Sequence, residues 1–250
     1  MKVNKYYQTT RYEKEMIQWR KEHYYPLRLS LLTEKLNLKF KGNILDAGCG
    51  DGGLAKEIGA RFPKVKIYGV DISREGCRLA KKYCIETKVA DLNRKIPYPD
   101  NYFDFIVSQE VLEHIIDTDK YFEEFYRVVK KGGQVVITTP NLLAWYQRLL
   151  CVLGIIPTFY ELSTKDRSIG LGILKKILHN TQPVGHIRVF AKLALADMAN
   201  LYGFRVLAIK GAPIKYEFSP IIQQLYDFLD HLFSLLPSFA SNLILYMEKK

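Results

Sequence analysis

A glycine-rich break between an apolar strand and a helix is the feature that most constrains this chain. Residues 43–47 form a short apolar run around Asp46, and residues 48–53 are rich in glycine before the helix-forming stretch 54–60. Glycine lets the backbone turn tightly and approach a ligand closely, because no Cβ intervenes. The helix that follows directs its unpaired N–H groups at whatever lies over the turn. The pattern predicts a nucleoside-binding site at the end of a first strand.

Acidic residues follow two further apolar runs. The run 65–70 ends at Asp71, and the run 85–90 ends at Asp91. A carboxylate at the end of the second strand is placed to accept hydrogen bonds from ribose hydroxyls. A fourth apolar run covers residues 103–108. Strands that alternate with helical segments in this way predict a doubly wound, mostly parallel α/β sheet.

The glycines leave two cofactor classes open. Gly48, Gly50 and Gly53 also satisfy the dinucleotide pattern G-x-G-x-x-G, which alone is weak evidence. Asp46, however, stands just before the first glycine, where a dinucleotide site must hold an anionic pyrophosphate. A cationic cofactor that carries an amino acid would tolerate or use that carboxylate. The sequence therefore favours such a cofactor, and NAD is the alternative.

The order of these motifs resembles class I S-adenosylmethionine (SAM)-dependent methyltransferases. Within that family the chain is most similar to the methyltransferase type 11 branch, typified by ubiquinone-biosynthesis O-methyltransferases. Residues 45–52 resemble the first motif, residues 103–114 the fourth, and residues 129–134 the turn into the fifth strand. Segments 185–190 and 201–206 also fit this branch. The resemblance implies a Rossmann-like, doubly wound, seven-stranded, mostly parallel sheet.

The resemblance also implies SAM as the cofactor and assigns residues to it. Asp71 matches the acid that binds the ribose, and Asp91 with Leu92 matches the pair that contacts the adenine. The predicted cofactor-binding residues are Asp46, Gly48, Cys49, Gly50, Gly52, Asp71, Ile72, Asp91, Leu92 and Gln109.

Two histidines are the candidate catalytic residues. The methyl group of SAM is already activated, so the protein mainly aligns an acceptor in line with it and excludes water. A hydroxyl acceptor additionally needs a base, for which His114 and His186 are the candidates. We expect transfer to oxygen of a small-molecule, glycan or lipid-like acceptor. A non-catalytic SAM-binding protein and an NAD-dependent oxidoreductase are the alternatives.

Metal and nucleic acid are both disfavoured. Glu110, Glu113 and His114 match metal-binding positions of some ubiquinone-pathway relatives, and their spacing predicts neighbouring faces of one helical turn. Acids at a helix start are common without a metal, so no metal ligand is predicted. No Asn/Asp-Pro-Pro-Tyr/Phe motif follows the fourth strand, as in enzymes that methylate adenine bases. Neither the fourth nor the fifth strand ends near a cysteine, which methylation at pyrimidine carbon would require.

The sequence predicts one domain with an N-terminal arm and an insertion. We expect further strands at 134–139, 204–210 and 242–247 and a helix near 190–201. Helices are also predicted from Ser73 to Cys84 and after Asp117. The domain over residues 1–250 divides into a helical arm (1–41), a SAM-binding core (42–141), an insertion or lid (142–185) and a C-terminal part (186–250) that contains an amphipathic helix (219–237).

That amphipathic helix is well marked. Ser219 can cap it, Pro220 suits its first turn, and apolar side chains recur at helical spacing from Ile221 to Leu236. We expect its apolar stripe to pack against the sheet or a second subunit, because its polar face carries acids where a membrane-surface helix prefers lysines. The insertion at 142–156 suits membrane contact better, or a lid over an apolar substrate.

Composition bears on partners and compartment. The net charge is +11, with the excess in the N-terminal arm and after residue 160. It favours anionic partners such as lipid-linked substrates or a membrane surface, unless the basic residues only form solvated helix faces. No signal-peptide pattern and no apolar run long enough to span a bilayer occurs. Four cysteines without C-x-x-C spacing predict free thiols. We expect a cytoplasmic monomer or homodimer, with peripheral membrane contact as an option.

Overall fold

One sheet organises the chain. The computed structural model describes residues 41–176, 183–214 and 220–250, so the predicted N-terminal arm and the capping residue Ser219 lie outside the described residues. The strands are β1 (Gly42–Ala47), β2 (Val65–Asp71), β3 (Glu86–Val89), β4 (Phe103–Gln109), β5 (Val129–Pro140), β6 (Phe204–Ala212) and β7 (Asn242–Lys249). The helices are α4 (Gly53–Arg61), α5 (Arg74–Ala80), α6 (Thr118–Val128), α7 (Trp145–Val152), α8 (Lys192–Leu201) and α9 (Pro220–Ser234). Two 3₁₀ turns, η2 (Leu112–His114) and η3 (Gly172–Lys176), complete the described elements.

The strand order confirms the expected sheet. It runs β3-β2-β1-β4-β5-β7-β6, and β7 is antiparallel to both of its neighbours. The pairs among β1 to β5 are parallel. The chain runs outward from β1 to β2 and β3 on one side and from β4 to β5 on the other, so the carboxyl ends of β1 and β4 form a switch point, where ligands bind in such sheets.

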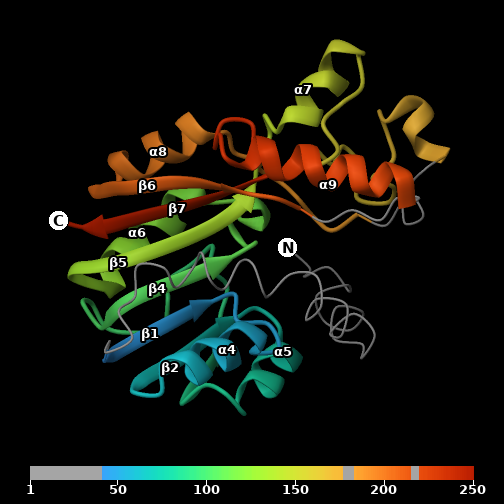
Figure 1. Cartoon of the computed structure of the whole chain (residues 1–250). Coiled ribbons are helices and arrows are strands. Elements are labelled where there is room, and N and C mark those ends of the chain that lie inside the picture. Colours follow the sequence, from blue (N-terminus) through green and yellow to red (C-terminus); the bar gives the residue numbers. More distant parts are fainter. Residues whose placement is uncertain (1–40, 177–182, 215–219) are drawn as a thin grey trace.

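Alternating strand residues face two separate cores. On β1, Ile44 packs with the buried side chains of α4 and α5, whereas Leu45 packs with those of α6 and α8. On β7, Ile244 and Leu245 divide in the same way. This period of two is what a sheet covered on both faces requires, and Figure 1 shows helices on either side of it. The doubly wound arrangement is confirmed.

Local signals set the helix starts. The Ser73 hydroxyl accepts a bond from the Gly76 N–H (3.1 Å) at the start of α5, and the Asp117 carboxylate accepts one from the Lys120 N–H at the start of α6. The predicted helix to Cys84 is too long, since α5 ends at Ala80. The Ile85 N–H donates to the Ile67 carbonyl (2.7 Å), so the chain must leave the helix to reach the sheet.

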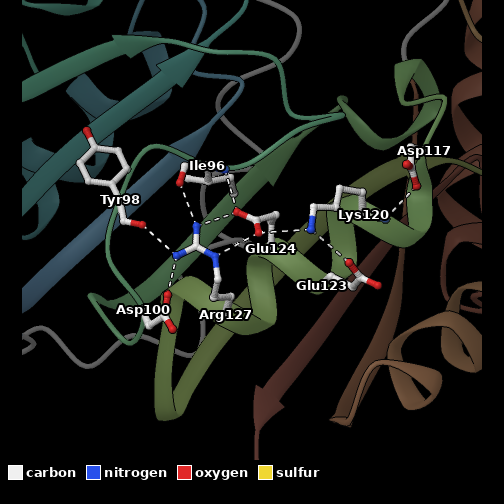
Figure 2. A network of polar contacts seen from close by, with 8 residues as sticks. All are labelled: Ile96, Tyr98, Asp100, Asp117, Lys120, Glu123, Glu124 and Arg127. Atoms are coloured by element: carbon white, nitrogen blue, oxygen red, sulfur yellow. Dashed lines mark hydrogen bonds and ion pairs between the residues drawn. The ribbon is translucent and has the colours of Figure 1, made fainter.

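A charged network holds the loop before β4 against α6 (Figure 2). The Arg127 guanidinium donates to the carbonyls of Ile96 (2.8 Å) and Tyr98 (2.9 Å) and to the Asp100 carboxylate (2.7 Å). Glu124, which is buried, pairs with Arg127 (2.6 Å) and accepts from the Ile96 N–H (2.7 Å). A bidentate guanidinium that also binds carbonyls fixes geometry better than a single surface pair.

Helix α9 lies in the opposite orientation to the predicted one. Its apolar residues Leu225, Phe228 and Leu232 are exposed, while Tyr226 and Asp230 are buried. The prediction that the stripe packs against the sheet is therefore wrong, and a second subunit is the alternative that is left. The surface of α9 that faces the protein is polar and aromatic.

Asp230 explains this orientation. Its Oδ1 accepts from the Trp145 indole N–H (3.0 Å) and from the Ser241 hydroxyl, and its Oδ2 accepts from the Ile214 N–H (2.8 Å). Trp145 also stacks on Phe233 at 5.3 Å between ring centroids. One buried carboxylate thus joins α9 to α7, to the end of β6 and to the residue before β7.

The four cysteines are free thiols, as predicted; Cys151 is exposed and the other three are buried. No helix among the described residues is both long enough and apolar enough to cross a membrane.

We predict that Asp230→Ala lowers the free energy of unfolding by roughly 1–3 kcal/mol, because buried donors on Trp145 and Ile214 lose their acceptor. Urea denaturation followed by circular dichroism measures the change. Asp227→Ala is the matched control, since this exposed residue accepts a hydrogen bond from Gln223 on the surface of the same helix (2.8 Å) and its loss should change the free energy of unfolding by less than about 0.5 kcal/mol. Equal losses in both variants would contradict the role given to Asp230.

Candidate functional site

The turn between β1 and α4 is closely packed. Gly48, Gly50 and Gly52 have φ values of 87°, 51° and 79°, in the region that favours glycine. A Cβ at residue 48 would lie 2.3 Å from a methyl carbon of Val111, and one at residue 52 would lie 2.8 Å from the Ala80 Cα. Side chains are therefore excluded from this turn on two sides, and the backbone alone lines it.

Asp71 ties this turn to the end of β2. One carboxylate oxygen accepts from the Gly50 N–H (2.8 Å) and the other from the Ser73 N–H (2.8 Å). The predicted ribose-binding acid is thus at the carboxyl end of β2 and is oriented by the glycine turn itself.

Two buried polar atoms at the same edge lack a hydrogen-bond partner among the described residues. They are Oδ2 of Asp46 and Nε2 of Gln109. Burial, together with the smaller effects of the charges on Asp71 and Asp51, raises the pKa of Asp46 to about 8. A buried acceptor at β1 and a buried donor at β4 fit a polar ligand, and a cationic group would relieve the cost of ionising Asp46.

The remaining predicted cofactor residues divide by their surroundings. Ile72 is 37% exposed, so its side chain is open to a ligand, whereas the side chains of Leu92 and Cys49 belong to the core. Asp91 Oδ1 accepts from the backbone and side-chain N–H groups of Asn93 (2.9 and 2.7 Å). Cys49 is packed so closely on Gly69 that it can offer a ligand only its backbone.

The two candidate catalytic histidines meet although they are far apart in sequence. Their ring centroids are 5.1 Å apart. His114 ends η2, just beyond β4, and His186 follows the insertion. The Glu113 carbonyl accepts from the N–H groups of Ile187 (2.7 Å) and Arg188 (3.2 Å), which brings the two segments together.

Backbone carbonyls fix the tautomer of both rings. His114 Nδ1 lies 2.9 Å from the Gly185 carbonyl oxygen, and His186 Nδ1 lies 3.2 Å from that of Phe159. A carbonyl only accepts, so each Nδ1 carries the proton and each neutral ring has its lone pair on Nε2. Burial lowers the pKa of His186, against the opposing effects of Glu161 and the Phe159 carbonyl. His186 is therefore neutral near pH 7.

Glu161 is a residue of this site that the sequence argument missed. Its carboxylate accepts from three successive N–H groups, those of Val184 (3.0 Å), Gly185 (2.8 Å) and His186 (3.2 Å). Glu161 belongs to the insertion, and nothing in its local sequence marks it.

Glu110 does not share a helical turn with Glu113 and His114, so that prediction is wrong. Glu110 has a φ of 54° and precedes η2. Its carboxylate accepts from the Thr138 hydroxyl (2.7 Å) and the Asn242 amide (3.0 Å) instead. The groups that converge are Glu113, His114 and His186, with potential ligand atoms all within 4.8 Å of one another.

Comparison with known proteins decides the family. The chain matches the family described as "Methyltransferase domain" over residues 17–209. This chain belongs to the methyltransferase-domain family. The match confirms the resemblance to SAM-dependent methyltransferases, and with it the class of enzyme and of cofactor.

Relatives of this methyltransferase differ in what their names say they methylate. It is 38% identical to phosphoethanolamine N-methyltransferase 3 of Arabidopsis thaliana over 112 residues, which cover 42% of this chain and 22% of that protein. It is 30% identical to ubiquinone biosynthesis O-methyltransferase of Proteus mirabilis over 144 residues, covering 53% and 58%. This chain thus spans only about a fifth to three fifths of the length of the curated relatives that it matches.

Solved structures share the fold of this methyltransferase at low identity. A SAM-dependent methyltransferase from Methanosarcina mazei has a TM-score of 0.60 and 19% identity, covering 91% of this chain and 98% of that chain. Phosphoethanolamine N-methyltransferase 2 of Haemonchus contortus, solved with S-adenosyl-L-methionine, has a TM-score of 0.60 and 18% identity, covering 99% and 60%.

We predict that Asp46→Asn stabilises the ligand-free protein at pH 8 but not at pH 4. The folded pKa of Asp46 is about 8 and its ordinary value is 3.8, so between these values unfolding releases a proton. Stability therefore falls as the pH rises from about 4 to about 8, and asparagine removes this loss. Thermal melts of both proteins across this range measure it. Asp51→Asn is the control, and an equal pH dependence in parent protein and Asp46→Asn would contradict the buried, protonated carboxyl.

Proposed function

We propose that this methyltransferase transfers the methyl group of SAM, by in-line displacement, to an oxygen of a small-molecule or lipid-like acceptor. The observation that carries the proposal is the convergence of Glu113, His114 and His186 beside the carboxyl end of β4. This is the edge at which ligands bind in doubly wound sheets. A hydroxyl acceptor must lose its proton, and the imidazoles of this cluster can receive it.

The same edge suits SAM. In the proposal, the backbone of residues 48–52 faces the methionyl part, and Asp71 binds the ribose hydroxyls. The partnerless Oδ2 of Asp46 accepts from the cationic amino group, directly or through water. Asp91 and the exposed side chain of Ile72 face the adenine. When bound, SAM supplies an electrophilic methyl carbon, so the protein's own residues need only bind, align and exclude water.

Either histidine can receive the acceptor proton. In its neutral form each ring carries the lone pair on Nε2, because its Nδ1–H is held by a carbonyl. His186 is the better candidate, since its lowered pKa keeps it unprotonated and Glu161 fixes its backbone. His114 then positions the acceptor. By their names, the relatives methylate nitrogen, oxygen or carbon, and the presence of a proton acceptor is what favours oxygen here.

A divalent cation is a second role that the same cluster supports. Two imidazole Nε2 atoms and a carboxylate form a common ligand set, and each ring already donates Nδ1–H to a carbonyl, as metal-bound histidines do. Thr139 donates to the Glu113 carboxylate (3.2 Å), which orients it. A bound cation would act as a Lewis acid and lower the pKa of an acceptor hydroxyl.

We predict that Asp71→Ala weakens SAM binding about tenfold to a hundredfold, which corresponds to ~1–3 kcal/mol for polar groups left without a partner. Isothermal titration calorimetry with SAM and with NAD measures both the affinity and the choice of cofactor. Glu75→Ala is the control, because this exposed carboxylate on α5 pairs with Arg78 of the same helix (2.6 Å). Unchanged SAM affinity in Asp71→Ala, or tight NAD binding by the parent, would contradict the assignment.

We predict that His186→Gln lowers turnover by ~10²–10⁴ with little change in SAM affinity, as loss of a general base does. The parent's activity should fall only below about pH 6.5, because the base must be neutral and burial lowers its pKa. His114→Gln should raise the KM for the acceptor more than it lowers turnover. Near-parent turnover for His186→Gln would rule out the base.

Treatment with EDTA distinguishes a bound metal ion from a general base in this cluster. If turnover is lost in EDTA and restored by a divalent cation, the cluster holds a metal ion. Activity that survives EDTA but is lost in His186→Gln supports the base alone.

A further inference from the structure

An apolar surface covers the outward side of α9 and the turn after it. Six large side chains there are between 49% and 76% exposed. They are Ile222, Leu225, Phe228, Leu232, Leu235 and Leu236. Single exposed apolar residues are ordinary, whereas a contiguous set on one helix marks a binding surface. We call these six residues the α9 stripe.

The α9 stripe cannot turn inward, because the opposite side of the helix is fastened. Asp230 is 1% exposed and holds Trp145, Ile214 and Ser241, and Phe233 stacks on Trp145. Rotating α9 to bury the stripe would break these bonds and expose Tyr226. The stripe is thus fixed on the outer side of α9, the helix at the upper right of Figure 1.

Spacing and charge favour a protein helix over a lipid surface. Leu225, Phe228, Leu232 and Leu235 follow the steps of three, four and three residues of a coiled-coil seam. Residues 220–234 contain no lysine or arginine, although the chain carries a net charge of +11. A helix that lies in an anionic bilayer surface typically has basic residues on its polar face, and α9 has Asp227 there.

We propose that the α9 stripe pairs with the α9 stripe of a second copy, antiparallel and about a twofold axis. An isologous contact needs only one self-complementary patch, and this is such a patch. Antiparallel packing would set Phe228 of one copy against Leu232 of the other, and Leu225 against Leu235. With about 100 Å² exposed on each of the six side chains, the pair buries on the order of 1,200 Å², which is the lower end of specific interfaces.

This inference does not depend on the proposed reaction, and it is tested by the mass in solution. Light scattering on a sizing column should give the parent protein twice the 29.0 kDa chain mass at micromolar concentration. Phe228→Glu and Leu232→Glu should each raise the dimer dissociation constant at least a hundredfold. The matched control is Leu193→Glu on α8, at a residue that is 74% exposed and outside the stripe. The control should remain a dimer.

Two further measurements keep the result decisive. Melting temperature and SAM affinity should be unchanged in Phe228→Glu, which shows that the variant is folded. The parent should not sediment with phosphatidylglycerol vesicles through the stripe. A parent that is monomeric at 100 μM, or vesicle binding that is lost in Phe228→Glu, overturns the proposal; the second result would assign the stripe to a bilayer.

Discussion

The absence of a side chain at residue 48 is the constraint on which the rest of the site depends. The β1–α4 turn and the loop after β4 are so close that a Cβ there would overlap Val111. Val111 directly precedes η2, which carries Glu113 and His114. The glycine turn and the loop that carries Glu113 and His114 are therefore held at contact distance by packing rather than by a flexible link. For a reaction that consists mainly of alignment, such a fixed spacing is the principal requirement.

The charges at the carboxyl ends of β1 and β2 favour a cationic ligand. Asp46 and Asp71 lie at the ends of adjacent strands, and burial makes ionisation of Asp46 costly in the empty protein. A positively charged ligand removes that cost. The ligand-free protein is therefore less stable than it would be without Asp46, and this loss of stability favours binding. The neighbouring N–H groups of Gly50 and Ser73 are already occupied by Asp71, which leaves its carboxylate oriented before any ligand arrives.

The parts that could be predicted are those encoded by neighbouring residues. Alternating apolar residues predicted the strands, Ser73 and Asp117 predicted two helix starts, and the glycines predicted the tight turn between β1 and α4 that Asp71 contacts. The predictions failed where a hydrogen-bond partner distant in sequence determines the local structure. Glu110 looked helical but bonds Thr138 and Asn242.

Contacts between residues distant in sequence also explain why the orientation of α9 and the role of Glu161 were not predicted. The apolar stripe of α9 was expected to face inward, but the bonds of Asp230 to other elements turn it outward. Glu161 gave no local signal, because its role lies in backbone N–H groups more than twenty residues away.

The way in which His186 is held has a consequence for the order of events in a catalytic cycle. The insertion supplies both the carbonyl that holds its ring and the carboxylate of Glu161 that holds its backbone. His186 is thus assembled into position only when the insertion is docked. In the proposed reaction, a movement of Phe159 and Glu161 away from His186 would also release the imidazole that accepts the proton, so methyl transfer would require the insertion in the position seen here.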